Sequence, residues 1–187
     1  MILPESIKTA VERGAQRLNA DGTKFVLVGT AALWHHNLKG IEAPSDVDFL
    51  CERIDGSLID LKITQPTGGQ QYGVHEEIEG IKVDYILADN GRGKFLSAKP
   101  DFSLASDIPV AQIADVLGLK WWANRPKDLA FFAKLRESPC FTGQQKGWCA
   151  PFCENWVALH EFLARNEKAI DAFLVQEQKV AEALLNA

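Results

Sequence analysis

Three aspartates in strand-like surroundings are the residues of this chain best suited to chemistry. Asp46 and Asp48 are two positions apart, and Asp84 lies within the apolar stretch of residues 81–87. Side chains alternate between the two faces of a strand, so Asp46 and Asp48 share a face, and Asp84 points away from its apolar neighbours. If these strands are neighbours in one sheet, the three carboxylates converge.

A converged cluster of carboxylates predicts bound metal, because ionised carboxylates repel one another unless a cation lies between them. We expect Mg²⁺, with Mn²⁺ as the substitute, since Mg²⁺ combines a few carboxylates with water and substrate phosphates. Two such ions about 4 Å apart can activate an attacking oxygen and stabilise a leaving pyrophosphate. Asp46 and Asp48 would hold the metals, and Asp84 would complete the site and help to deprotonate an acceptor hydroxyl. The alternative is that Asp46 caps a turn beside Pro44, while Asp48 and Asp84 are solvated on an exposed sheet face.

Gly29-Thr30 is the second feature, because it follows the apolar run of residues 25–28 and precedes a helical pattern. A helix N-terminus offers unpaired backbone N–H groups and a positive dipole end, which suit nucleotide phosphates. The Thr30 hydroxyl would add a donor. An ordinary tight connection between a strand and a helix has the same sequence, and this is the simpler interpretation of Gly29-Thr30 taken alone.

The elements that position these residues follow from periodicity and turn residues. Apolar residues at spacings of three and four predict helices, and short apolar or alternating runs predict strands. In the first half we expect a helix at 5–20, a strand at 25–28, a helix at 31–38, and strands at 47–52, 58–63, 74–78 and 81–88. Glu79-Gly80 is a two-residue hairpin turn in this scheme.

The second half of the chain is helical in pattern. Helices are predicted at 113–123, 126–136, 154–166 and 168–185, with residues 137–151 as a connector. Strands followed by helices predict an α+β fold, with a small mixed or antiparallel sheet, helices packed on one face, and a C-terminal helical extension. We place the domain boundary between residues 105 and 106, with a single compact domain as the alternative.

Composition limits the classes of function. The chain has 187 residues, an apolar fraction of 47% and a formal net charge of −5. This charge argues against a surface that binds long nucleic acid mainly through phosphates. No apolar run reaches the roughly 18 residues of a membrane span, and residues 1–5 lack a secretion signal, so we expect a cytoplasmic protein.

Taken together, Gly29-Thr30, Asp46-Val47-Asp48 and Asp84 resemble the nucleotidyltransferase superfamily that shares its catalytic core with DNA polymerase beta. The resemblance implies a metal-dependent transfer of a nucleoside monophosphate from a triphosphate to a hydroxyl, with release of pyrophosphate. The acceptor would be a small molecule, an RNA end or a protein side chain.

Residues 108–120 and the following Arg125-Pro126-Lys127-Asp128 look like the helical part of the minimal bacterial members of this superfamily. That subgroup includes antibiotic nucleotidyltransferases and toxin components of abortive-infection systems. The resemblance places Lys120 at the triphosphate, with Arg125, Lys127 and Asp128 as further nucleotide-site residues. The alternative interpretations are a solvated lysine at a helix end and an ordinary helix start with Pro126 in the first turn.

The chain departs from the family pattern in ways that keep a second function open. The spacer between Thr30 and Asp46 has fifteen residues, and Ile41 and Glu42 stand where relatives often have arginine. A nucleotide-binding module without turnover, for example half of a toxin and antitoxin pair with an antitoxin-like partner, is the alternative. A metal-dependent phosphohydrolase is a third, weaker interpretation.

The four cysteines are expected to be free thiols or metal ligands, because an intracellular chain of this length rarely carries a disulfide framework. Four soft or borderline ligands lie within 21 residues of one another, and they could hold structural zinc: Cys140, Cys149, Cys153 and His160. Their spacing lacks a paired-cysteine knuckle, so buried or idle thiols are the preferred interpretation.

Overall fold

A computed structural model of the chain describes residues 3–36, 42–63, 72–88, 108–123 and 125–137. The chain divides into two compact units, one of residues 1–38 and 42–117 and the other of residues 39–41 and 118–187. No helix among the described residues is long and apolar enough to cross a membrane. The predicted boundary at 105/106 falls where residues 89–107 are not described, so it stays a prediction.

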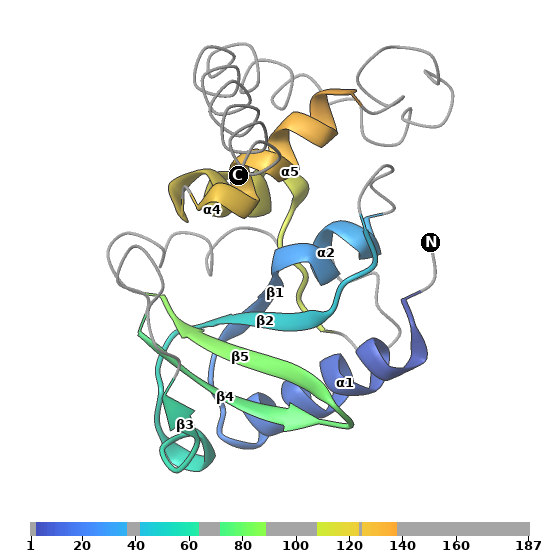
Figure 1. Ribbon diagram of the computed structural model, residues 1–187. Helices are drawn as coiled ribbons and strands as arrows, with labels where there is room; N and C mark the ends of the chain where they lie inside the picture. The colour runs from blue at the N-terminus through green and yellow to red at the C-terminus, as the bar shows by residue number, and fades with distance from the viewer. Residues whose placement is uncertain (1–2, 37–41, 64–71, 89–107, 124, 138–187) are drawn as a thin grey trace, which may run out of the picture. The chain divides into compact units, whose positions relative to one another are not determined.

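The first unit is built on a five-stranded sheet in the order β1-β2-β5-β4-β3 (Figure 1). β2 and β5 run parallel, and every other neighbouring pair is antiparallel. The strands are β1 (Phe25–Val28), β2 (Asp46–Cys51), β3 (Lys62–Ile63), β4 (Gly73–Ile78) and β5 (Ile81–Leu87). This mixed sheet with helices confirms the predicted α+β class.

The β4–β5 hairpin forms as its sequence predicts. Glu79 and Gly80 have φ values of 52° and 78°, the positive values that a two-residue hairpin turn requires. Ile78 pairs with Ile81 beside the turn, and the pairing continues to Gly73 opposite Ile86. The turn therefore fixes the register of β4 against β5.

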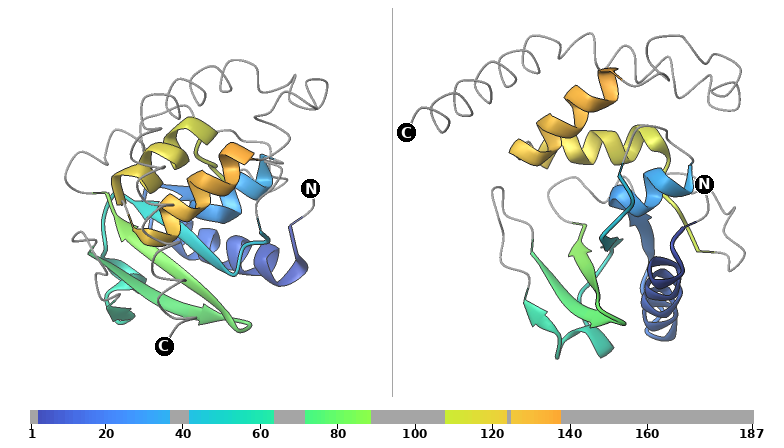
Figure 2. Two further views of the ribbon diagram at one scale, coloured as in Figure 1. Left: turned by 45° about the horizontal axis from the view of Figure 1, so that its top comes forward. Right: turned by 45° about the vertical axis from the view of Figure 1, so that its right-hand side comes forward.

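Helix α1 (Glu5–Ala20) covers one face of the sheet and contacts β2, β4 and β5 (Figures 1 and 2). Its apolar side chains at spacings of three and four are buried, as predicted. The face that it covers carries Phe49, which stacks on Tyr85 with ring centroids 5.9 Å apart and meets Phe25 edge to face at 5.5 Å. This aromatic layer forms the centre of the core.

A partly buried polar network joins α1 to the same face of the sheet. Arg17 donates from Nε and Nη2 to the two carboxylate oxygens of Glu76, each at 2.9 Å. Tyr85 donates its hydroxyl to Glu76 Oε1 at 2.5 Å. Burial, and then the hydrogen bond to Glu76, raise the pKa of Tyr85 well above its ordinary value. The phenol is thus a structural donor.

Residues 108–111 cover the outer edge of β1, a feature that the periodicity did not predict. Val110 forms a parallel bridge with Leu27, whose N–H donates to Pro109 O at 2.8 Å and whose carbonyl accepts from Ala111 N at 2.9 Å. His36 is 8% exposed, and its Nε2 lies 2.8 Å from Ala111 O. The segment therefore ties the end of α2 (Gly29–His35) to the sheet.

The strand predicted at 58–63 is mostly wrong. Residues Gly56–Leu58 form a short 3-10 helix, and only Lys62–Ile63 pair as a strand. The physical reason is a capping interaction with a residue distant in the sequence: the Asp21 carboxylate accepts from Ser57 N at 2.9 Å and from Ser57 Oγ at 2.6 Å. These bonds lower the pKa of Asp21 and bend the chain before it reaches the sheet edge.

The remaining described helices are α4 (Ile113–Ala123) and α5 (Pro126–Glu137), close to their predicted limits. The helix predicted at 31–38 begins two residues earlier, at Gly29. The predicted helices at 154–166 and 168–185, and nearly all of the connector at 137–151, lie outside the described residues.

Candidate carboxylate site

The parallel pairing of β2 with β5 brings two of the three aspartates face to face. Asp48 is the cross-strand partner of Asp84, and Asp46 is the partner of Lys82. Residues paired across neighbouring strands point to the same face of a sheet. Three carboxylates and one ammonium therefore share the face that is opposite to α1, since Phe49 and Tyr85 point to the other side.

The surroundings of these carboxylates differ. Asp84 is 6% exposed, whereas Asp46 and Asp48 are half-buried. Lys82 Nζ lies 2.8 Å from Asp84 Oδ2, and 47% of the Lys82 side chain is exposed. The ammonium places a positive charge beside this buried carboxylate, which offsets the cost of removing it from water.

Asp48 and Asp84 fit a divalent cation as a pair of oxygen donors. Mg²⁺ is commonly held by one or two carboxylates and takes its remaining ligands from water and substrate phosphates. Over the described ranges, no group of three or more His, Cys, Asp or Glu side chains is arranged to hold a metal ion. The structure thus places Asp48 opposite Asp84, while Asp46 lies beside Lys82 in the register.

Gly29 is the residue that lets the chain turn against Asp48. Its φ is +69°, and a Cβ atom added there would lie 2.1 Å from Asp48 Oδ2. Glycine is therefore required for two independent reasons, the positive φ and the close approach of the carboxylate. The predicted Gly29-Thr30 turn is part of the same local structure as Asp48, although α2 itself has only seven residues.

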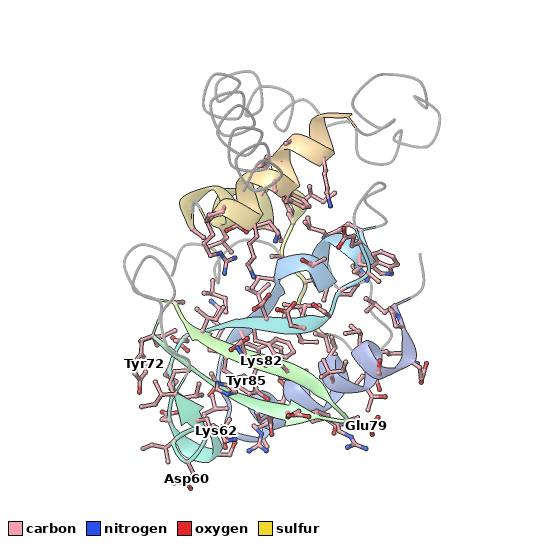
Figure 3. The ribbon with its side chains drawn as sticks, in the orientation of Figure 1. Asp60, Lys62, Tyr72, Glu79, Lys82 and Tyr85 are labelled. Atoms are coloured by element: carbon pink, nitrogen blue, oxygen red, sulfur yellow. The ribbon has the colours of Figure 1, made fainter. Side chains whose placement is uncertain are left out.

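An open groove of about 540 Å³ lies on the β3 and β4 side of the sheet. Lys62 and Lys82, both labelled in Figure 3, line it together with His75, which pairs with both Lys62 and Asp84. Asp60 and Glu77 also line it, so the groove carries both signs of charge.

The candidate nucleotide residues of the second unit form a cluster of their own. Asp128 is 1% exposed and accepts from Arg125 Nε at 2.6 Å and Nη2 at 3.2 Å. Lys120 Nζ lies 3.9 Å from Asp128 Oδ1 and 5.0 Å from the centre of the Phe131 ring. Arg125 and Asp128 thus make the contacts of a helix start, and Lys120 is mostly buried rather than solvated. Lys127 is exposed.

The likeness of this chain to solved structures is distant. No family model matches the sequence, and no curated protein matches it. A solved structure described as "Crystal structure of putative nucleotidyltransferase from H. pylori" is similar over 74% of this chain and 71% of that chain, with 16% identity and a TM-score of 0.43. A likeness of that size decides nothing about the site, so the chain's own residues carry the proposal below.

Sequence reasoning missed Lys82, although the signal was present. Lys82 and Asp84 are two positions apart in a strand, so they share a face, as Asp46 and Asp48 do. His75 is a cross-strand residue on β4, paired with both Asp84 and Lys62. The candidate zinc ligands, Cys140, Cys149, Cys153 and His160, lie outside the described residues.

Proposed function

We propose that this chain is a metal-dependent nucleotidyltransferase, which moves a nucleoside monophosphate from a triphosphate to a hydroxyl acceptor. The observation that supports it most is the register of Asp48 against Asp84, with Gly29 turned directly against the Asp48 carboxylate. The carboxylates of Asp48 and Asp84 offer oxygen ligands on one face of two adjacent parallel strands. The Asp48 carboxylate lies so close to position 29 that only glycine fits there.

The proposed reaction has a simple balance of bonds. The acceptor oxygen bonds to the α-phosphorus of the triphosphate, the bond between the α-phosphorus and the bridging oxygen breaks, and pyrophosphate leaves. The hydroxyl proton passes to a carboxylate oxygen of Asp84, the most buried of the three aspartates.

The three aspartates divide the remaining work. Asp48 and Asp84 would hold Mg²⁺ or Mn²⁺. Asp46, on the same face, would become a third ligand only after a side-chain rearrangement, because among the described residues these three acids are not grouped to hold a metal ion. The cation would stabilise negative charge on the attacking and leaving oxygens. Gly29 keeps the Asp48 carboxylate in place, because any side chain there would overlap it.

The chemistry of the candidate residues and the net charge of the chain indicate how the nucleotide and the acceptor would bind. Gly29 and Thr30 of the first unit would lie at the phosphates. Lys120, Arg125, Lys127 and Asp128 of the second unit remain the nucleotide residues that the resemblance implies. Positive side chains beside the phosphates offset the charge that develops on pyrophosphate. The net charge of −5 favours a small or local acceptor over long nucleic acid. We place this activity in the cytoplasm.

Replacing Asp48 by asparagine tests the proposal. Purified protein is incubated with labelled nucleoside triphosphates, Mg²⁺ and candidate acceptors, and labelled product and pyrophosphate are measured. Asp48→Asn keeps the shape of the side chain but removes a charged oxygen ligand, so we expect transfer to fall about 100-fold or more. The variant should keep the circular dichroism spectrum of the parent.

The matched control is Asp55→Asn. Asp55 pairs with Arg53 at an exposed site, Nε to Oδ2 at 3.0 Å, and exposed pairs of this kind contribute about 1 kcal/mol or less. Transfer by this variant should equal that of the parent. Equal transfer by Asp48→Asn as well would rule out the proposed role of the carboxylates.

A nucleotide-binding module without turnover is the second candidate, and the Lys82–Asp84 ion pair favours it. An ammonium 2.8 Å from Asp84 Oδ2 can satisfy this carboxylate with no metal. Calorimetric titration separates the two functions. Triphosphate binding that is the same in Mg²⁺ and in chelator, without pyrophosphate release, would support the module, and release of pyrophosphate only with metal would support the enzyme.

A further inference from the structure

Lys82 lies among the three aspartates Asp46, Asp48 and Asp84 on one face of the sheet, and we call these four residues the carboxylate set. In the register of β2 against β5, Lys82 is the cross-strand partner of Asp46 and lies two residues before Asp84 on the same face. Its Nζ lies 2.8 Å from Asp84 Oδ2. One cation thus belongs to the same four-residue set as three carboxylates.

We propose that Lys82 is a positioning residue that competes with the divalent cation for Asp84. The proposal rests on the proposed function, because it assumes that Asp84 is a metal ligand. In this role Lys82 keeps the Asp84 carboxylate oriented when no metal is bound. It releases the carboxylate when the divalent cation takes the same oxygen.

The electrostatics of the set support this role. Asp84 is 6% exposed and is the cross-strand partner of Asp48, so a cation beside it offsets the cost of burying one carboxylate next to another. The Lys82 ammonium provides that compensation within the same strand. The ammonium lies 2.8 Å from Asp84 Oδ2, and a metal ion bound to the same oxygen would be repelled by this positive charge, so the binding of one weakens the binding of the other.

The mobility of the lysine stem makes the exchange feasible. Lys82 has four methylene groups and 47% of its side chain is exposed, so its ammonium can move into water or toward the groove beside β3 and β4. Asp84 itself is fixed by the sheet on both sides, through Asp48 on β2 and His75 on β4. The lysine is therefore the partner that moves.

The simpler interpretation is that Lys82–Asp84 is an ion pair that only stabilises the fold. The two interpretations differ in their effect on metal affinity. A purely structural lysine, when removed, leaves metal affinity unchanged or lowers it by disturbing Asp84. A competing lysine, when removed, raises metal affinity, since the cost of displacing the ammonium disappears.

The experiment measures Mn²⁺ binding by electron paramagnetic resonance of the full chain, without nucleotide. Lys82→Met should bind Mn²⁺ at least about threefold more tightly than the parent, and Lys82→Arg, which keeps the charge, should stay within about twofold. Lys62→Met is the matched control, because Lys62 is an exposed lysine of the same groove that lies on β3 rather than beside Asp84. It should bind Mn²⁺ as the parent does.

Thermal denaturation gives a second readout. In chelator Lys82→Met should unfold at a lower temperature than the parent, and saturating Mn²⁺ should recover more stability in this variant than in the parent. If Lys82→Met does not fold in chelator, Lys82→Gln is measured in the same way. Folding of either neutral variant only in Mn²⁺ supports the proposal, and failure to fold in both conditions overturns it.

The outcomes separate this inference from the proposed function. Mn²⁺ binding by the parent with equal or weaker binding by Lys82→Met overturns the competition and leaves the enzyme proposal in place. No Mn²⁺ binding by the parent or by Lys82→Met overturns both. Tighter binding by Lys82→Met and parent-like binding by Lys82→Arg support the inference.

Discussion

At the scale of single residues, Gly29 and Asp48 form one unit. Asp48 is the residue opposite Val28 in the β1–β2 pairing, and Gly29 follows at once with a φ of +69°. A strand that ends at position 28 must turn away from the sheet without covering the Asp48 carboxylate. Only a residue without a side chain meets both conditions, so the glycine serves the backbone and the carboxylate together.

Gly29→Ala should lower the free energy of unfolding by more than the cost of its positive φ alone. The positive φ costs about 1–3 kcal/mol for a residue with a Cβ atom, and the added methyl group would overlap Asp48 Oδ2. Urea denaturation measures the loss of stability, and Mn²⁺ binding measures the displacement of Asp48. We expect both to decrease.

Gly80→Ala is the control for this prediction. Gly80 has a φ of +78°, but an added Cβ would meet nothing within 4 Å. Gly80→Ala should lose the stability that a positive φ costs a residue with a Cβ atom, and it should bind Mn²⁺ as the parent does. Similar losses of stability and equal binding in the two variants would contradict the close approach of Gly29 to Asp48.

At the scale of elements, α1 supports the strands that carry the aspartates. Gly14 lies so close to the sheet that an added Cβ would be 2.6 Å from Phe49 Cε2 and 3.3 Å from Tyr85 OH. Phe49 and Tyr85 are the cross-strand pair that directly follows Asp48 and Asp84 in the register. The depth at which α1 packs therefore bears on the backbone beneath the carboxylates.

Gly14→Ala tests whether the higher helix propensity of alanine outweighs the overpacking of its methyl group against the sheet. Alanine is favoured over glycine inside a helix by about 1 kcal/mol, whereas overpacking of a core costs about 1–3 kcal/mol. Because Phe49 is fully buried and cannot easily move, we expect a net loss of about 1 kcal/mol in the free energy of unfolding. Chemical denaturation measures it.

Gln16→Ala is the control in the same helix, since Gln16 is exposed and the substitution gives at most a small change. A gain of stability in Gly14→Ala would show that α1 can move away from the sheet, and the tight contact between α1 and β2 would then be wrong.

At the scale of the whole molecule, the core of the first unit encloses a thiol that reports on its unfolding. Cys51 is fully buried at the end of β2, and burial raises the pKa of its thiol to about 12. Because the thiolate is the reactive form, a thiol in this state reacts only after the sheet opens. Cys51 is thus a structural residue and a probe of the sheet.

In a variant with Cys140, Cys149 and Cys153 replaced by serine, Cys51 should resist labelling by a thiol reagent at pH 8. Labelling should become complete in denaturant, with a midpoint that matches the loss of circular dichroism, since both follow unfolding of the same sheet. Rapid labelling without denaturant would contradict the burial of β2.

The sequence by itself determined the local elements and the identity of the acids. Helix α1, the β4–β5 hairpin and the alternation that puts Asp46 and Asp48 on one face follow from periodicity and turn residues, which act over a few residues. The strand predicted at 58–63 failed because the Asp21 carboxylate, 36 residues from Ser57 in the sequence, caps the 3-10 helix. The pattern of residues around 58–63 cannot reveal a hydrogen-bond partner that is so distant in the sequence.

Only the tertiary structure decided which strands are neighbours. The parallel pairing of β2 with β5 joins residues 36 positions apart, and it sets Asp48 opposite Asp84 and Lys82 opposite Asp46. A shift of one residue would send Asp84 to the α1 face, because side chains alternate along a strand. The buried aromatic pair of Phe49 and Tyr85, packed under α1, makes that shift costly. The sequence thus determines which acids are present, and the packing of Phe49 and Tyr85 on the α1 face determines the register that sets Asp48 opposite Asp84.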